Sequence, residues 1–383
     1  MKNYIKYSAV AIIALIFILS GCGPKPIPQQ SILDTPQNHY KQGLRELDRG
    51  DLDNAKMEFD RAIKLSPSYA GGYVGLALVH SSKNEFDLAF KMIDKAIGKD
   101  KDFVDAYIAE GRIITQQKKD KDWIKKAEKS FKKALKISPD SYKAMFYLGV
   151  AYKEAFLFDK AADTFRKVIA SKGDYSKAAD KEWELVQKIQ RAEPGTELGK
   201  KIALIPEIDR SDLAVLLIEE LKILTILEKK RPKTYDTNFR APEDKLEMKK
   251  REAEQAKITD IQNHWAKTWI KQVADNGIME KFPDNTFRPD EKITRSNFAM
   301  VLQNLLILVT GDKSLSTKYI GSPARFPDVN PSHYSYNAIC LAVDRGFMST
   351  KDLNGEFGFK DHVSGADALL MIRKFQNALR LTF

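Results

Sequence analysis

The sequence predicts an all-α protein in which a helical solenoid is followed by a second helical domain. Two observations predict this. Small and aromatic residues recur at a fixed spacing along the first half, and a motif with helix-start and helix-end signals recurs in the second half. The 383 residues are enough for two or three domains, and 43% hydrophobic and 30% charged residues are typical of a soluble globular protein.

The N-terminus has the features of a signal peptide. Lys2 and Lys6 precede an uncharged apolar run that is too short to span a bilayer as a helix. The run ends in "LSGC", which resembles the lipobox of bacterial lipoproteins. The resemblance implies a signal peptide at 1–21, acyl chains on Cys22 that attach the protein to a membrane, and a place on the outer membrane facing the periplasm. An ordinary signal peptide with a chance cysteine is the alternative.

Residues 22–37 are expected to form a Pro-rich linker, which extends about 3.1 Å per residue where it is polyproline-like. Removal of Lys2 and Lys6 with the signal peptide would lower the net charge from +11 to +9. A basic mature protein suits anionic polymers or lipid headgroups, and a nucleic-acid partner is not expected in a secreted lipoprotein. With Cys22 lipidated, Cys340 has no disulfide partner and is expected to be a small buried hydrophobe.

A unit of about 34 residues recurs four times over 38–173. Each unit has a small residue in its first helix and a small–large–small triad in its second. These are Gly43, Ala55, Phe59 and Ala62; Ala77, Ala89, Ile93 and Ala96; Gly111, Ala127, Phe131 and Ala134; and Gly149, Ala161, Phe165 and Val168. The pattern resembles the tetratricopeptide repeat. The resemblance implies a concave surface that binds an unidentified protein, with a pure spacer as the alternative.

The second half contains "HWAKTWIKQVADNGIMEKFPDNTFRPDEKITRSN" within residues 258–312. Trp265 begins an apolar stripe at helical spacing, Gly277 is placed to end that helix, and Thr294 is placed to cap the next one. This stretch resembles the S-layer homology domain, whose hallmarks include "HWA", "NGI", "F-x-D-x-x-F-x-P" and "ITRAE". Here "TRSN" stands where that family has "TRAE".

Two further copies are less complete. Residues 326–383, after a loop at 313–325, keep Asp328, Tyr334 and Gly346, but Gly365 stands where the arginine would be. Residues 174–228 form a degenerate first copy, which is also expected to cap the solenoid. Its Trp183 and Gly195 are spaced like Trp265 and Gly277, and Asp209 and Arg210 open its second helix. Residues 229–257 are expected to be a charged linker or an exposed helix.

The resemblance implies three repeats about a pseudo-threefold axis and a site for cell-wall polysaccharide or peptidoglycan. Arginine at the first turn of a helix opposes the helix dipole, yet it occurs in two copies. We expect free backbone N–H groups and the guanidinium to converge there on an anion. The candidate glycan-binding residues are Asp209, Arg210, Asp260, Trp265, Thr294, Arg295, Asp328 and Tyr334.

The candidates have different expected roles. Asp209 and Thr294 are expected to be helix caps beside the arginines. Asp260 and Asp328 either cap the first helix of their repeat or bind sugar hydroxyls, and capping is the favoured interpretation. Trp265 and Tyr334 are expected to be mainly core residues, with stacking on a sugar ring as a secondary role.

No catalytic motif, metal-ligand spacing or cofactor-binding motif is found, so neither an enzyme nor a cofactor is expected. The sequence predicts a non-catalytic envelope lipoprotein. Its lipid would hold a membrane, its second half would bind a wall polymer, and its repeats would bind a protein. The alternative is an accessory lipoprotein for assembly, secretion or polysaccharide export, in which the repeats do the main work and the second half only localises the protein.

Overall fold

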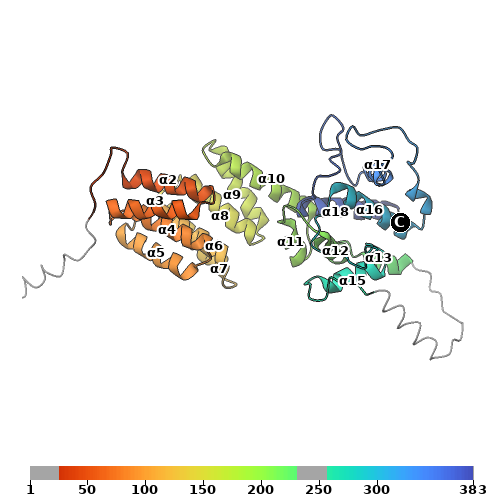
Figure 1. Ribbon diagram of the computed structural model, residues 1–383, viewed down its shortest axis with the longest axis horizontal. Coiled ribbons are helices and arrows are strands. Elements are labelled where there is room, and N and C mark those ends of the chain that lie inside the picture. Colours follow the sequence, from red (N-terminus) through yellow and green to blue (C-terminus); the bar gives the residue numbers. More distant parts are fainter. Residues whose placement is uncertain (1–25, 231–256, 383) are drawn as a thin grey trace, which may run out of the picture. The chain divides into compact units, whose positions relative to one another are not determined.

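The computed structural model describes residues 26–230 and 257–382 (Figure 1). Within these ranges every regular element is a helix, as predicted. The predicted signal peptide, Cys22 and most of the predicted charged linker lie outside the described residues. The chain divides into two compact units, and the division falls inside helix α10 (Ser176–Ala192), between Glu184 and Leu185.

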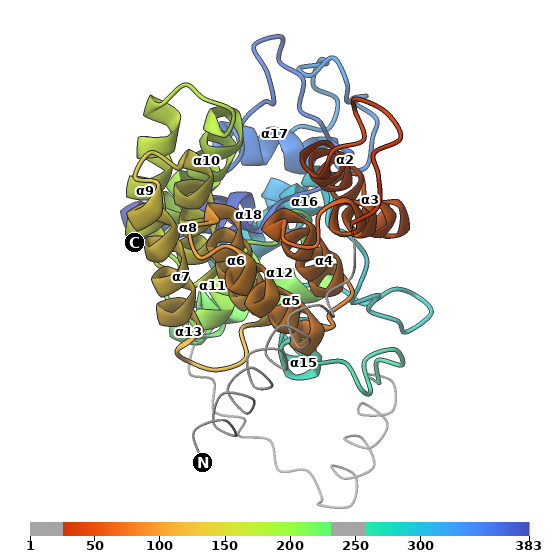
Figure 2. The same cartoon turned by 90° about the vertical axis from the view of Figure 1, so that its left-hand side faces the viewer.

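The first unit is a stack of four antiparallel helix pairs. The pairs are α2 (Pro36–Asp48) with α3 (Leu52–Leu65), α4 (Ala70–Ser82) with α5 (Phe86–Lys99), α6 (Val104–Gln117) with α7 (Trp123–Ile137), and α8 (Tyr142–Glu154) with α9 (Phe158–Ala170). Figure 2 shows these pairs from the end that carries α2 and α3. The extra residues of the third repeat form the loop between α6 and α7.

Each of three pairs closes around an aromatic side chain that faces a glycine. Phe59, Phe131 and Phe165 have no exposed surface. A Cβ atom added to Gly111 would lie 2.6 Å from the ring of Phe131, so only glycine lets the two helices approach this closely. The alanines of the repeat pattern are buried around these rings. The recurring small and large residues in the sequence are therefore those at which the two helices of a pair pack together.

The end of the predicted linker is packed against the first helix pair. The backbone N–H of Ile27 donates to the carbonyl of Lys64 at 3.0 Å. The buried carboxylate of Asp34 accepts hydrogen bonds from Arg61 and lies 2.7 Å from Nε2 of His39. Residues 26–35 are thus part of the solenoid's N-terminal cap, and α2 begins directly after its N-cap Thr35.

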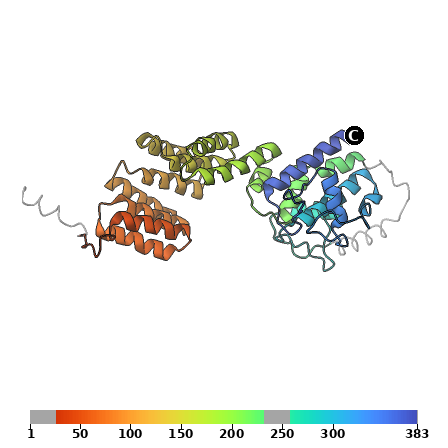
Figure 3. The same cartoon turned by 90° about the horizontal axis from the view of Figure 1, so that it is seen from above.

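The second unit is a bundle of α-helices of 7 to 18 residues joined by long turns. Besides the end of α10 it contains α11 (Glu197–Ala203), α12 (Arg210–Glu219), α13 (Ile223–Lys230), α15 (Lys267–Asp275), α16 (Arg295–Thr310), the 3-10 helix η1 (Lys313–Ser316), α17 (Tyr336–Asp344) and α18 (Gly365–Thr382). The C-terminal helix α18 packs against α11, so the third repeat contacts the first (Figure 3).

A closed ring of three backbone hydrogen bonds lies at the centre of the second unit. Ile208 donates its N–H to the carbonyl of Val363 at 2.9 Å, Val363 donates to Ile293 at 2.9 Å, and Ile293 donates to Ile208 at 3.0 Å. All three side chains are buried. Each residue comes just before the N-cap of α12, α16 or α18, so the three repeats meet in equivalent positions around a pseudo-threefold axis.

The helix-end signals are correct in the second and third repeats and wrong in the first. Gly277 and Gly346 follow α15 and α17 with φ of 65° and 69°, as a glycine at a helix end is expected to do. Gly195 does not play this part. The α10 helix ends at Ala192, Glu193 takes the positive φ of 47°, and the short helix α11 follows where the other repeats have their turn. Cys340 is fully buried, as expected.

Candidate functional site

The predicted caps occupy their expected positions. Thr294 accepts a hydrogen bond from the backbone N–H of Asn297 at 3.2 Å. Asp209 accepts from the N–H of Asp212 at 2.9 Å, and Asp212 accepts from the N–H of Asp209 at 3.2 Å, which completes a capping box. The arginines Arg210 and Arg295 are therefore the first residues of α12 and α16.

Arg210 joins the first repeat to the second, and we call this contact the first junction. Its Nε donates to the carbonyl of Phe287 at 2.7 Å, and its Nη2 donates to the carbonyl of Glu280 at 2.8 Å. The guanidinium also lies over the rings of Phe287 and Phe282, 4.5 and 4.9 Å from their centroids.

Arg295 repeats this arrangement between the second and third repeats, at the second junction. Its Nε donates to the carbonyl of Phe357 at 2.8 Å and its Nη2 to the carbonyl of Ser349 at 2.5 Å. The guanidinium lies 4.7 Å from the ring centroid of Phe357. Neither Arg210 nor Arg295 uses its Nη1 in a hydrogen bond to another described residue, so one edge of each guanidinium is left for a ligand.

The backbone N–H groups at these helix starts are not free, and that part of the prediction is wrong. The N–H groups of Arg210 and Ser211 donate to the carbonyls of Glu291 and Pro289, both at 3.0 Å. The N–H groups of Arg295 and Ser296 donate to Asp361 and Phe359 at 2.9 and 3.1 Å. The turn of the next repeat satisfies the helix start, so any anion would meet the guanidinium edge alone.

The junction arginines stay charged although they are half-buried. Burial lowers the pKa of Arg210 from its ordinary value, while the charge of Glu291 acts in the opposite direction. Burial likewise lowers the pKa of Arg295, against the charges of Asp367, Asp361 and Asp328. A guanidinium remains protonated throughout the physiological range even after such shifts. The first and second junctions therefore each present a permanent, half-buried cation.

Asp260 and Asp328 are not caps of the first helices, and the favoured interpretation of them is wrong. Asp260 accepts hydrogen bonds from the N–H groups of Phe287 and Arg288 at 2.8 and 2.7 Å. Asp328 accepts from those of Phe357, Gly358 and Phe359 at 2.8, 2.7 and 3.3 Å. Each carboxylate thereby holds the turn whose phenylalanine carbonyl receives the arginine of its junction.

Trp265 and Tyr334 point outward, so the expectation that they are mainly core residues is wrong. Their exposed fractions are 53% and 73%. Each follows a histidine that contacts the turn of its junction, the segment whose carbonyls accept hydrogen bonds from the helix start. Nε2 of His264 lies 3.4 Å from a carboxylate oxygen of Asp290, and the ring centroids of His333 and Phe359 are 5.3 Å apart. At the first and second junctions, an exposed aromatic residue therefore directly follows a histidine that contacts the turn.

The third junction, between the third and first repeats, has no arginine because the backbones are too close. The N–H of Gly365 donates to the carbonyl of Ile205 at 2.9 Å. A Cβ atom on Gly365 would lie 1.7 Å from the carbonyl oxygen of Ile202. Gly365 is not among the residues with positive φ, so close approach, not backbone conformation, excludes a side chain here.

Some contributors to the first junction were missed from the sequence. The guanidinium of Arg288 lies 3.8 Å from the ring centroid of Phe282 and pairs with Asp284 at 3.2 Å. Its φ of 53° matches the 69° of Gly358 at the equivalent place. Gly358 was the available signal. A glycine there indicates a left-handed backbone position in the turn of the third repeat, and Arg288 occupies the equivalent place in the turn of the second repeat.

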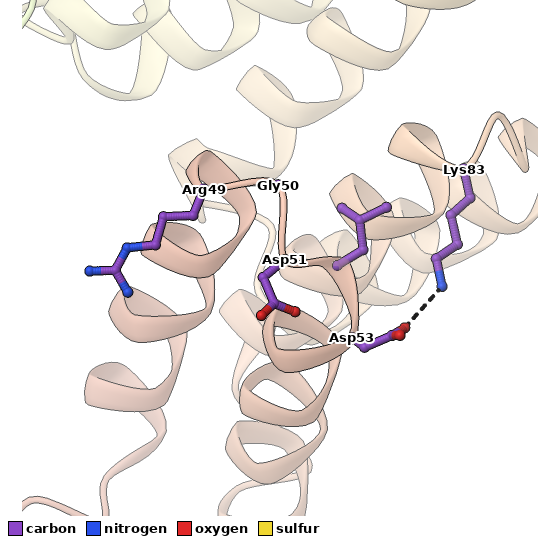
Figure 4. A pocket seen from close by; sticks show the side chains of 6 residues that line it. Arg49, Gly50, Asp51, Asp53 and Lys83 are labelled. Carbon is purple, nitrogen blue, oxygen red and sulfur yellow. Dashed lines mark hydrogen bonds and ion pairs between the residues drawn. The ribbon is translucent and has the colours of Figure 1, made fainter.

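A surface hollow of about 560 Å³ lies in the other unit, at the turns of the first two repeats (Figure 4). Its lining includes Arg49, Asp51, Asp53 and Lys83, and Lys83 pairs with Asp53 at 3.4 Å. The hollow contains none of the predicted site residues. Its charges are largely exposed, so the junctions remain the candidate site.

Comparison with known families agrees with this arrangement. The S-layer homology domain family matches residues 257–299 and 325–369, and the tetratricopeptide repeat family matches residues 40–103 and 124–179. The chain therefore contains tetratricopeptide repeats and S-layer homology repeats. Modules of these families are non-catalytic; the former generally mediate protein interactions and the latter generally bind cell-wall polymers. The S-layer homology repeats indicate an association with the cell envelope.

Individual proteins resemble parts of the chain. Cell surface glycoprotein 1 of Acetivibrio thermocellus is 30% identical over 114 residues, which is 29% of this chain and 5% of that protein. A thermophilic TPR protein of Thermus thermophilus is 18% identical, with a TM-score of 0.35, over 50% of this chain and 94% of that one. PilF of Pseudomonas aeruginosa is 19% identical, with a TM-score of 0.31, over 57% of this chain and 97% of that one.

The described residues contain no candidate for a membrane-spanning helix. None of the helices in 26–230 and 257–382 is both long and apolar enough to cross a bilayer.

Proposed function

We propose that this protein is an envelope tether that binds an anionic cell-wall polymer at two junctions and a protein partner through its solenoid. The observation that carries the proposal is the pair of equivalent junctions. Each combines a half-buried guanidinium, with one edge unused among the described residues, and an exposed aromatic ring. A guanidinium edge suits a carboxylate or phosphate group, and an aromatic face suits the apolar face of a sugar ring.

The remaining parts of the tether come from the first half of the chain. Lipid on Cys22 would anchor the protein in the outer membrane facing the periplasm, and residues 26–35, which pack on the first helix pair, would lie between that anchor and the first repeat. The concave face of the solenoid would recruit the protein partner, as tetratricopeptide repeats generally do. Peptidoglycan or a polymer attached to it would be the ligand of the junctions.

The sharpest test removes the exposed aromatic rings and leaves the arginines in place. Replacing an arginine would also break two hydrogen bonds to carbonyls, which would disturb folding and binding together. The double variant Trp265→Ala, Tyr334→Ala should stay folded and lose at least about tenfold in affinity for purified wall sacculi, measured by co-sedimentation. The control is Ile320→Ala, which removes an exposed apolar side chain outside the junction turns.

Equal sedimentation of wild type, test variant and control would show that the junctions do not bind the wall. Absence of sacculus binding by the wild type would favour the alternative, an accessory factor for assembly, secretion or polysaccharide export that acts through its repeats. The anchor is tested separately. Cys22→Ser should abolish labelling by a fatty-acid analogue, and normal labelling of that variant would reject the lipid anchor.

A further inference from the structure

The second helix of the third repeat carries an unusual set of charges. Helix α7 contains six lysines and one acidic residue, Glu128. The corresponding helices of the other repeats are nearly balanced: α3 has three basic and three acidic residues, and α5 and α9 each have three basic and two acidic residues. Because all four helices have the same structural role, the fold does not demand the lysines of α7.

Four of these lysines form a line along the exposed face of the helix. Lys125, Lys129, Lys132 and Lys136 are spaced by four, three and four residues, and all are exposed. We call these four residues the lysine ridge. At 1.5 Å per residue the ridge is roughly 16 Å long. The opposite face of α7, with Ala127, Phe131 and Ala134, is buried in the solenoid.

The ridge works against the stability of its own helix. Lysines four apart on a helix repel each other by about 0.2–0.5 kcal/mol per pair, and Lys125 lies near the positive end of the helix dipole. Local acids offset this only in part. Lys125 pairs with Asp122 at 2.9 Å and Lys132 with Glu128 at 2.6 Å, while Lys129 and Lys136 form no ion pair with described residues. Ion pairs of exposed lysines are weak, so a ligand can displace them.

The chemistry of the ridge identifies the kind of ligand. Protein interfaces are depleted in lysine and depend on aromatic or apolar anchors, and α7 exposes none along the ridge. Surfaces for single-stranded nucleic acid interleave cations with exposed aromatic rings, which the ridge also lacks. A row of lysines acts as a line of point charges without directional recognition. That arrangement fits a flexible chain of evenly spaced negative charges.

We propose that the lysine ridge of α7 binds an acidic polysaccharide, as a second polymer contact on the solenoid. The contact would be electrostatic and tolerant of sequence or branching, in contrast to the junctions with their guanidinium edge and aromatic ring. Its affinity should fall steeply with salt, because each neutralised charge releases a counterion. A purely ionic contact of this kind slides along its ligand, whereas the junctions would hold a particular group.

The test uses the full mature chain and immobilised polygalacturonate at low and high salt. The ridge variant Lys125→Gln, Lys129→Gln, Lys132→Gln, Lys136→Gln should bind at least about tenfold more weakly at low salt, with a salt slope reduced by about three. The control variant Lys64→Gln, Lys91→Gln, Lys95→Gln, Lys99→Gln removes the same charge from exposed lysines of α3 and α5 and should bind like wild type. Circular dichroism checks that both variants fold.

The same measurement is repeated in the Trp265→Ala, Tyr334→Ala background, so that loss at the ridge is separated from loss at the junctions. Equal binding by the ridge variant and wild type would overturn the proposal. Equal weakening by ridge and control variants would also overturn it, because net charge alone would then explain binding. Wild-type binding to phosphatidylglycerol vesicles or to single-stranded DNA, without binding to polygalacturonate, would likewise overturn it and assign the ridge to a different ligand.

Discussion

At the scale of single residues, the second unit depends on charged groups that bond backbone atoms of another segment. Arg210 and Arg295 each donate two hydrogen bonds to carbonyls of the next repeat, and Asp260 and Asp328 receive the N–H groups of the same turns. A hydrogen bond to a charged group contributes about 1.5–3 kcal/mol. The arginine edge offered to a ligand is therefore held by the same contacts that hold the repeats together.

Asp212 makes a pH-dependent contribution to stability. Its pKa is raised from 3.8 to about 6. Burial is the largest cause and raises the pKa, the backbone hydrogen bond from Asp209 lowers it, and the charge of Asp209 raises it. Because the folded state binds this proton more tightly than the unfolded state, stability should fall as pH rises from about 4 to about 6. Asp212→Asn keeps an acceptor for the capping box and should remove this fall, with a gain of about 1–3 kcal/mol at neutral pH.

The measurement for Asp212 is the free energy of unfolding by urea at several pH values between about 4 and 8, which brackets the titration. Asp367→Asn is the matched control at the same position of α18, where the carboxylate pairs with Lys188 at 3.1 Å. That control should lose up to about 1 kcal/mol at neutral pH. Parallel pH profiles for wild type and Asp212→Asn would show that the carboxyl of Asp212 does not titrate differently in the folded state.

At the scale of elements, the helix pairs of the solenoid are set by small residues facing large ones. This is why the sequence predicts the first unit so well: contacts within a pair lie between neighbours in the chain, and their spacing recurs. The junctions were harder to predict. Arg210 reaches Phe287, 77 residues away, and Arg295 reaches Phe357, 62 residues away. The sequence predicts the position of each arginine on its helix, but no local pattern indicates which carbonyls accept its hydrogen bonds. Nor does it indicate that other carbonyls accept hydrogen bonds from the N–H groups of the helix start.

Gly111 tests the contact within a pair. Gly111→Ala would place a methyl group 2.6 Å from the Phe131 ring, which is fully buried and has little room to move. The variant should be destabilised by about 1–3 kcal/mol, although alanine is the better helix former. Gly98→Ala, in helix α5, meets nothing within 4 Å and should instead stabilise by roughly 0.5–1 kcal/mol. Thermal unfolding of both variants decides, and a gain in stability for Gly111→Ala would show that the helices are not closely packed there.

At the scale of the whole molecule, the repeats of the two compact units are held together in different ways. In the first, pairs stack on their neighbours in sequence. In the second, the ring of Ile208, Val363 and Ile293 joins residues from all three repeats, 155 positions apart at its widest. The threefold arrangement was inferred from family resemblance, because a ring closed by backbone atoms leaves no trace in side-chain periodicity. The degenerate first repeat keeps its place in the ring although α11 has replaced its turn.

The ring of backbone hydrogen bonds predicts that the three repeats of the second unit unfold cooperatively. Ile208→Ala should cost about 2–5 kcal/mol, because the side chain is fully buried and its loss leaves a cavity. Hydrogen exchange followed by mass spectrometry should then show faster amide exchange in α16 and α18, although Ile208 belongs to neither helix. Ile293→Ala should give the same regional pattern, whereas Ile113→Ala, an equally buried change in α6, should speed exchange in the solenoid. Faster exchange confined to α11 and α12 in Ile208→Ala would show that the three repeats unfold separately and that the ring does not couple them.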